Sequence, residues 1–204
     1  MRLPREHALM RGIDEASPNW PQLIIHESSP ENRGTSIRLA NECHKYTASQ
    51  FYKNEETGSI VKGFRCENLE NLTFDANSID LHITQNVMEH VYNPDLAFKE
   101  IARTLKPGGA HIFTVPIVNK CNPKKIRARL NERHEFEYLH EPVYHGNPID
   151  DNGSLVTVDW GFDICHFIYN RSGLFTYLIH IDDLSMGIRA DFFEVLMTLK
   201  PHFQ

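Results

Sequence analysis

Residues 79–116 read IDLHITQNVMEHVYNPDLAFKEIARTLKPGGAHIFTVP, and this stretch decides the fold. Alternating apolar side chains predict a buried strand that starts at residue 79, and the chain then turns sharply at Gln85 and Asn86. A helical pattern, a glycine pair and a second, mostly apolar strand over residues 110–115 follow without a break. This succession of strand, helix and strand indicates half of an α/β nucleotide-type fold.

The helix in the middle of this stretch has clear start and stop signals. Asn93 is a candidate N-cap, and Pro94 at the first helical position has its φ angle already set. The residues of the expected buried stripe are Ala97, Ile101 and Leu105, with Phe98 and Ala102 beside them. The helix is expected to end at Lys106, because the residue before Pro107 is disfavoured in the α region and two glycines follow.

Other apolar stretches predict the rest of the fold. Strands are expected over residues 23–27, 46–51, 64–66, 175–181 and 192–199, and further helices over residues 33–43 and 157–170. The side chains expected to face inward are Ile37, Leu39 and Ala40 in the first of these helices and Ile164, Phe167 and Ile168 in the second, before a stop at Gly173. Their spacing is that of one helix face.

The chain divides into an arm and one domain. Residues 1–22 contain three prolines and little periodicity, so we expect a surface arm with at most one helical turn. Residues 23–204 are expected to form a single domain. Residues 119–150 are too long and polar for an ordinary connection, so they are interpreted as a lid or insertion.

Composition narrows the class of protein. The 204 residues are 41% hydrophobic and 24% charged, which suits one globular domain. A formal net charge of −6 argues against a general nucleic-acid surface, which needs clustered cations. The four cysteines are widely spaced and show no metal or disulfide pattern, which favours a reducing cytoplasm. No apolar run is long enough for a membrane span.

The central stretch resembles a known family. Residues 79–83, 89–91 and 105–109 read IDLHI, EHV and LKPGG, and residues 70–74 before them read ENLTF. This combination is similar to that of class I S-adenosylmethionine-dependent methyltransferases, type 11-like, and covers about residues 23–200. The resemblance implies a three-layer Rossmann-like sandwich with a mostly parallel seven-stranded sheet in the order 3-2-1-4-5-7-6, the last strand antiparallel. It implies S-adenosylmethionine as the cofactor.

The cofactor loop departs from the family pattern. Where the family has a glycine-rich loop, residues 26–34 read HESSPENRG, with one late glycine. The acidic residue after the second strand is missing, and Asn68 stands where the family has an adenine-contacting aspartate. The residues predicted to contact the cofactor are Glu27, Ser28, Ser29, Ser49, Asn68, Leu69, Gln85 and Asn86.

Two interpretations of the first loop stay open. In one, Glu27 and the two serine hydroxyls replace the glycine loop, and the carboxylate faces the sulfonium or amino group of the cofactor. In the other, Ser28 to Pro30 form only a turn and N-cap, and Glu27 pairs with Arg33 or Arg38.

Two histidines are candidate catalytic residues. His90 lies over the expected cofactor crevice, and an imidazole with a pKa near neutrality suits removal of a hydroxyl proton. His145 would bind the acceptor from the opposite side, within a substrate wall that also includes Tyr144, Trp160 and Asp163. The spacing of His134, His140 and His145 matches no metal site, so no bound metal is predicted.

The sequence thus predicts S-adenosylmethionine-dependent methyl transfer to the oxygen of a small molecule or glycan precursor, without nucleic-acid or membrane partners. The alternative is a non-catalytic relative that has lost the cofactor loop and binds a partner or glycan. A metal-dependent hydrolase that uses the histidine-rich lid is a third hypothesis.

Overall fold

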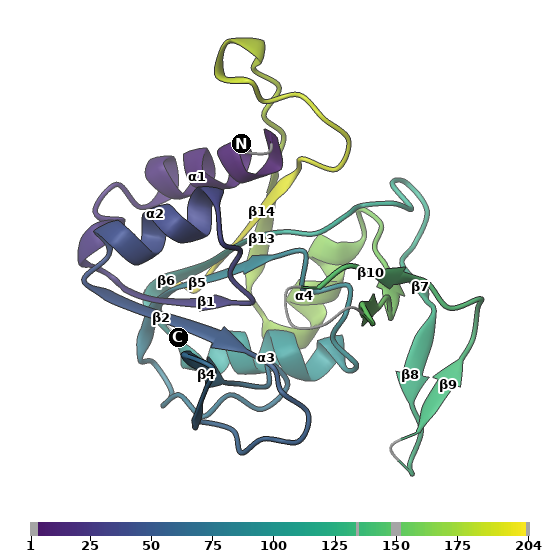
Figure 1. The fold of residues 1–204 in the computed structure, drawn as a ribbon. Helices are drawn as coiled ribbons and strands as arrows, with labels where there is room; N and C mark the ends of the chain where they lie inside the picture. The colour runs from purple at the N-terminus through teal and green to yellow at the C-terminus, as the bar shows by residue number, and fades with distance from the viewer. Residues whose placement is uncertain (1–3, 134, 148–151, 203–204) are drawn as a thin grey trace.

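The computed structural model describes residues 4–133, 135–147 and 152–202. Its main sheet has eight strands in the order β13-β14-β6-β5-β1-β2-β4-β3 (Figure 1). The strands are β1 (Ile24–Ser28), β2 (Lys45–Gln50), β3 (Ile60–Val61), β4 (Phe64–Cys66), β5 (Ile79–Gln85), β6 (Leu105–Thr114), β13 (Phe175–Ile179) and β14 (Val195–Leu199).

The strand order confirms the predicted topology and adds one strand. Strands β4, β2, β1, β5 and β6 are parallel neighbours, and β14 lies antiparallel between β6 and β13. This is the order 3-2-1-4-5-7-6. The eighth strand, β3, pairs antiparallel with β4 at the edge over two residues, too few for any periodic signal.

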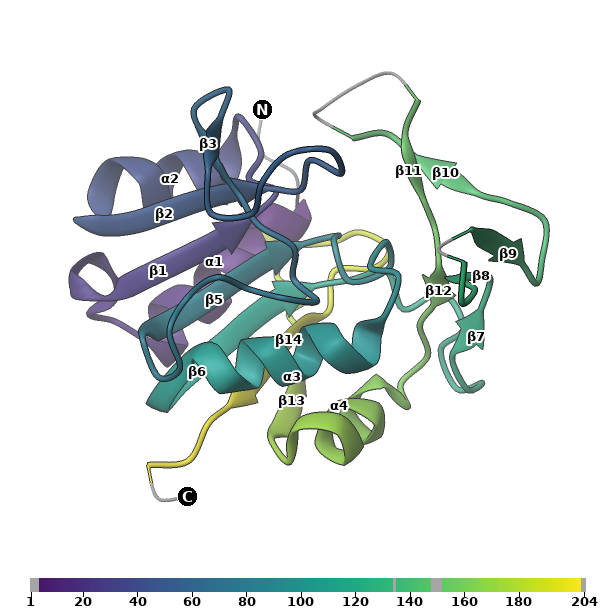
Figure 2. The ribbon, with the colours of Figure 1, turned by 90° about the horizontal axis from the view of Figure 1, so that it is seen from below.

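Helices cover both faces of the sheet, which confirms the three-layer sandwich. Helices α1 (Pro4–Ala16) and α2 (Gly34–Glu42) lie on one face, and α3 (Pro94–Thr104) and α4 (Ile164–Ser172) on the other (Figures 1 and 2). Two separate apolar clusters fill the two interlayer spaces. Short 3-10 helices occupy Trp20–Gln22 and Leu184–Met186.

The expectation for the N-terminal arm was wrong. Helix α1 has 13 residues, and its Ala8, Leu9 and Ile13 are fully buried in the cluster that also holds Ile25 of β1. Pro4 stands at the first helical position and the other prolines follow the helix, so none of them interrupts it. The first 16 residues therefore include part of the core.

The side chains of α2 that face inward are not all the ones predicted. Leu39 is buried as expected, but Ala40 is exposed and Ile37 is 45% exposed. Thr35 and Ser36 face inward instead, because their hydroxyls donate to the Glu6 carbonyl and to the Glu27 carboxylate. Buried polar partners set the phase of this helix, and a pattern of apolar residues cannot show them.

The central helix and strand differ from the prediction only at their boundaries. Asn93 is the N-cap of α3 and accepts a hydrogen bond from the Leu96 amide at 3.3 Å. The helix ends at Thr104, and β6 begins at once with Leu105, so the glycine pair lies inside the strand. Helix α4 starts at Ile164, later than predicted, and ends at Gly173 as predicted.

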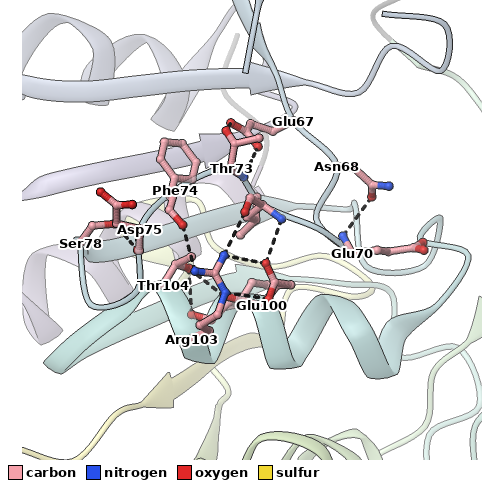
Figure 3. Close-up of polar contacts among 12 residues, drawn as sticks. Glu67, Asn68, Glu70, Thr73, Phe74, Asp75, Ser78, Glu100, Arg103 and Thr104 are labelled. Carbon is pink, nitrogen blue, oxygen red and sulfur yellow. Dashed lines mark hydrogen bonds and ion pairs between the residues drawn. The ribbon is translucent and has the colours of Figure 1, made fainter. Parts of the chain in front are cut away.

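A loop without helical residues, 67–78, connects β4 to β5 and is tied to α3 (Figure 3). The Arg103 guanidinium donates to the Phe74 carbonyl at 3.0 Å and to the Leu72 carbonyl at 2.9 Å, and it pairs with Glu100. Glu100 in turn accepts from the Leu72 amide. These contacts tie residues 72–74 of the loop to the last turns of α3, whereas Asn68 lies toward the other end of the helix (Figure 3).

A chain of hydrogen bonds crosses the sheet through two buried histidines. His26 contacts Ser49 Oγ at 2.7 Å and His82 Nδ1 at 2.9 Å, and His82 Nε2 contacts Thr104 Oγ1 at 2.8 Å. Thr104 donates its only proton to a carbonyl of α3, so it accepts from His82, which accepts from His26. The His82 ring is neutral, because a further proton on its Nδ1 would face the N–H of His26, and burial disfavours the charged form of His26.

Leu9→Ala should test whether α1 belongs to the core. We expect a loss of about 2–5 kcal/mol in the free energy of unfolding, because the side chain is fully buried. Leu184→Ala, at a leucine that is 65% exposed, is the matched control in urea denaturation. If the two variants are equally stable, α1 does not contribute to the core and is a surface arm.

Stability should fall as pH falls from 7 to 5. Burial lowers the pKa of His26 and His111 to about 3 and that of His82 well below its ordinary value. The unfolded chain binds these protons near pH 6.5, so the stabilisation is complete above that pH and is lost toward pH 3. Each histidine contributes a slope of at most about 1.4 kcal/mol per pH unit.

Urea titrations at a series of pH values measure this slope. His111→Leu should reduce it, whereas His140→Gln, at an exposed histidine, should leave it unchanged. If His111→Leu leaves the slope unaltered, His111 does not contribute to the pH dependence of stability.

Candidate active site

A cleft of about 930 Å³ opens at the carboxyl ends of the parallel strands. This is the edge at which open α/β sheets bind ligands, and the volume suits a cofactor together with an acceptor. The floor comes from the ends of β1, β2 and β5 and from the loop after β4.

The roof of the cleft comes from the predicted insertion. The insertion predicted over residues 119–150 contains the short strands β7 (Lys125–Ile126), β8 (Ala128–Leu130), β9 (Phe136–Tyr138) and β10 (Tyr144–His145), and β11 (Ser154–Leu155) and β12 (Val158–Asp159) follow just after it. Figure 2 shows them gathered at one end of the sheet. Strands β10 and β11 pair with each other and supply the roof residues of the cleft. Whether this segment opens and closes stays a prediction.

Most of the predicted cofactor residues line the cleft. These are Ser28, Ser29, Asn68, Leu69, Gln85 and Asn86, together with Gln50, Phe51 and Tyr52 from the end of β2. Ser49 does not, because it is fully buried against His26.

Glu27 does not reach the cleft, and neither sequence interpretation describes it. The carboxylate is fully buried and accepts from Ser36 Oγ at 2.7 Å, from the Tyr46 hydroxyl at 2.6 Å and from Gln85 Nε2 at 2.8 Å. Burial raises its pKa, and these three donors oppose that shift. Glu27 therefore acts on the cleft indirectly, by holding the Gln85 side chain.

The arginines proposed as partners of Glu27 have other carboxylates. Arg33 pairs with Glu6 at 2.7 Å and Arg38 with Asp14 at 2.8 Å. Both acids belong to α1, whose contribution to the core the sequence reading missed.

The first loop turns without a glycine. Ser29 has φ +54° and Asn86, at the end of β5, has φ +52°, a left-handed conformation that costs non-glycine residues about 1–3 kcal/mol. The Ser29 amide donates to the Ser49 carbonyl and its hydroxyl to Gln50. Asn86 accepts from Arg5 at 2.7 Å. These hydrogen bonds stabilise Ser29 and Asn86 in a left-handed conformation that glycine would adopt without strain.

The single glycine of the loop accommodates a carboxylate of the chain itself. Gly34 has φ +55°, and a Cβ there would lie 2.2 Å from Glu6 Oε2. A helix N-terminus normally attracts anions, and here Glu6 from α1 already lies against it. The start of α2 is thus covered by protein.

Glu89, His90 and His145 form what we name the carboxylate–imidazole cluster. His90 Nε2 and His145 Nδ1 lie 3.8 and 4.0 Å from Glu89 Oε1, and the two ring centroids are 5.2 Å apart. Glu89 is 2% exposed, and neither of its carboxylate oxygens accepts a hydrogen bond from another described residue. All three residues line the cleft.

Burial changes the acid–base character of this cluster. It lowers the pKa of His90 to about 4, well below the near-neutral value expected from sequence, and raises that of Glu89 to about 8. His90 Nδ1 lies 2.9 Å from the Leu155 carbonyl, so this nitrogen carries the proton. Glu89 is the site residue that sequence reasoning passed over, although it stands beside His90 in the EHV motif.

The predicted substrate wall divides into two parts. Tyr144 and His145 line the cleft, as expected. Trp160 and Asp163 do not: Trp160 is fully buried and donates to the Met88 carbonyl at 3.1 Å, and Asp163 accepts from the Lys124 amide at 2.8 Å. These two residues anchor the insertion to the domain.

Among the described residues, the histidines considered for a metal site, His140 and His145, do not share a cluster of candidate ligands. His140 is exposed, and His134 lies outside the described residues. Only His145 joins a cluster, and it does so with Glu89 and His90.

Comparison with known proteins shows what the chain is similar to. Residues 34–113 match the model of a family described as methyltransferase domain. No curated protein sequence is significantly similar to the chain. None of the helices in the described part of the chain combines the length and apolarity that a membrane span requires.

Solved structures share the fold over nearly the whole chain. An S-adenosylmethionine-dependent methyltransferase from Mesorhizobium loti is 14% identical, with a TM-score of 0.55 over 95% of this chain and 98% of that one. The YcgJ protein of Bacillus subtilis is 12% identical, with a TM-score of 0.59 over 96% and 98%. The cyclase SpnF is 12% identical, with a TM-score of 0.53 over 96% and 80%. The chain thus shares the fold of S-adenosylmethionine-dependent methyltransferases, and its residues 34–113 match the methyltransferase domain family.

Proposed function

We propose that this protein transfers a methyl group from S-adenosylmethionine to a hydroxyl oxygen of a small molecule or glycan precursor. The observation that carries the proposal is the presence of two chemically different walls in one cleft. One wall, from the strand ends, offers uncharged side chains such as Ser29, Gln50 and Phe51 beside charged ones such as Glu67, and the other is the carboxylate–imidazole cluster under the roof.

The wall formed by the strand ends fits the adenosine part of the cofactor. Phe51 and Leu69 offer apolar surface for the base, and Asn68, Ser29 and Gln50 offer hydrogen-bonding groups. Because Glu6 covers the start of α2, Arg5 is our candidate partner for the carboxylate of the methionine part. The cofactor supplies an electrophilic methyl carbon on a sulfonium, and the chain supplies alignment.

The second wall fits a hydroxyl acceptor. A hydroxyl donates a hydrogen bond and must lose its proton when the oxygen is methylated, and the cluster presents lone pairs on Glu89 and on His90 Nε2. His90 thus acts as a hydrogen-bond acceptor rather than as a near-neutral base. Tyr144 and His145 would contact the rest of the acceptor. We place the protein in the cytoplasm, in line with its four unpaired cysteines.

The second candidate function is non-catalytic binding. It is favoured by the contact between Glu6 and Gly34, because the chain itself covers the end of α2 that would otherwise be open to an anionic ligand. The similarity to a cyclase of the same fold is a further reason to test methyl transfer directly.

Cofactor binding should be weak. We expect S-adenosylhomocysteine to bind in the tens of micromolar or weaker, because the absent acidic partner costs about 1–3 kcal/mol. Phe51→Ala should weaken binding by about 10-fold. Phe175→Ala, at an exposed phenylalanine outside the cleft, should not. Calorimetry that shows nanomolar affinity would contradict this account, and no binding at millimolar ligand would favour the non-catalytic candidate.

Methyl transfer is tested by screening hydroxyl-bearing small molecules and glycan precursors with isotopically labelled cofactor. With an accepted substrate, Tyr144→Ala should raise the acceptor KM by about 10-fold and leave cofactor affinity unchanged, because Tyr144 lies in the roof. Tyr177→Ala, at an equally exposed tyrosine outside the cleft, is the control. Identical kinetics in both variants would remove Tyr144 from the acceptor site.

A further inference from the structure

We infer that the carboxylate–imidazole cluster is a binding site for one divalent transition-metal ion. Its three candidate ligand atoms, one each from Glu89, His90 and His145, all lie within 4.8 Å of one another. They come from the turn after β5 and from β10, which are more than 50 residues apart in the chain. The fold, and not a local motif, brings them together.

The burial of the Glu89 carboxylate without donors from other residues indicates a bound ligand. Buried carboxylates in proteins are normally paired or hydrogen-bonded, because an unsatisfied one loses its hydration without compensation. Glu89 is 2% exposed, and neither oxygen accepts a hydrogen bond from another described residue. Within 4 Å of it the described cationic groups are His90 and His145, which are neutral when their nitrogens serve as ligands. A bound cation would satisfy this carboxylate.

His90 is oriented as a metal ligand would be. Its Nδ1 donates to the Leu155 carbonyl at 2.9 Å, which leaves the Nε2 lone pair directed toward Glu89 at 3.8 Å. Ligating histidines almost always donate their other ring N–H to a carbonyl or carboxylate in this way. The Glu89 backbone is held as well, since the Thr157 amide donates to its carbonyl at 2.8 Å. Two of the three ligands are therefore preorganised.

The ligand set indicates the class of cation. Two imidazoles and one carboxylate suit zinc, iron(II), manganese, cobalt or nickel, whereas calcium and magnesium prefer oxygen ligands alone. Metal–ligand bonds of about 2.1 Å place tetrahedral ligands about 3.4 Å apart. The cluster is wider than this, so His145 must move inward. It lies on a two-residue strand and its side chain is 44% exposed, which leaves it room to move.

One charge opposes the cation. Arg5 lines the same cleft, and its field acts on both Glu89 and His145, although its own hydrogen bond goes to Asn86. On the other side, Asp159 acts on His145 with the opposite sign and is itself paired with Arg127. Neutralising Arg5 should therefore strengthen cation binding.

Metal binding itself does not depend on the proposed methyl transfer, but the role of the ion rests on it. With three protein ligands, the remaining coordination positions face the cleft, where the acceptor hydroxyl would bind. A hydroxyl on a divalent cation loses its proton more readily, and the proton would pass to water at the open roof. The ion would thus position the oxygen and make it a better nucleophile.

The test uses untagged, chelator-treated full-length protein and cobalt(II) as the probe. Calorimetry should show one equivalent bound, and visible absorption should show the ligand-field bands of a bound cobalt ion. Glu89→Gln and His145→Gln should each weaken binding by about 100-fold or more, and Arg5→Gln should strengthen it several-fold. His140→Gln, at an exposed histidine of the same insertion, is the matched control and should bind as the unaltered protein does.

Two outcomes would overturn the inference: no stoichiometric binding by the unaltered protein, or equal binding by His145→Gln and His140→Gln. Because His145 is half-exposed, its replacement should leave thermal unfolding nearly unchanged, and this measurement separates ligand loss from misfolding. S-adenosylhomocysteine binding by the metal-free protein is measured in parallel. If it persists without cobalt binding, only the metal site is lost; if cobalt binds and the cofactor product does not, the proposed function is lost.

Discussion

The buried carboxylate of Glu27 is the constraint on which the cleft depends. It joins three other elements to β1 through single hydrogen bonds: α2 through Ser36, β2 through Tyr46 and β5 through Gln85. Each bond to a buried carboxylate contributes about 1.5–3 kcal/mol, and removal of any donor leaves part of the charge uncompensated. This one side chain therefore sets the rotation of α2 and holds Gln85 at the floor of the cleft.

Glu89 is also a buried acid, but it differs from Glu27 in its hydrogen bonding. Both acids are buried near the ends of central strands, but Glu27 has three donors whereas Glu89 has no hydrogen bond from another described residue. Three hydrogen-bond donors from the surrounding elements make Glu27 a structural group. The open lone pairs of Glu89, beside two imidazoles in a cleft, leave it available for chemistry.

The insertion completes the site because it is anchored at its base. Trp160 packs against Phe98 and Phe167 and donates to the Met88 carbonyl, next to Glu89. Thr157 bonds the Glu89 carbonyl directly. These contacts lead β10 and β11 back over the sheet, so that His145 reaches His90. The segment is polar and has little secondary structure, but these contacts still position His145 in the cleft.

The sequence by itself determined the central helix with its cap and the end of α4, because these follow from local periodicity and turn chemistry, and its resemblance to class I methyltransferases predicted the strand order and most of the cleft floor. It did not determine the roles of Glu27, Glu89 or Trp160, nor the burial of α1. Those depend on which polar groups meet across the fold: Glu6 with Gly34, Ser36 with Glu27, and His145 with Glu89. Only the tertiary structure brings such distant residues together, and only their burial decides whether a carboxylate is satisfied or free to act.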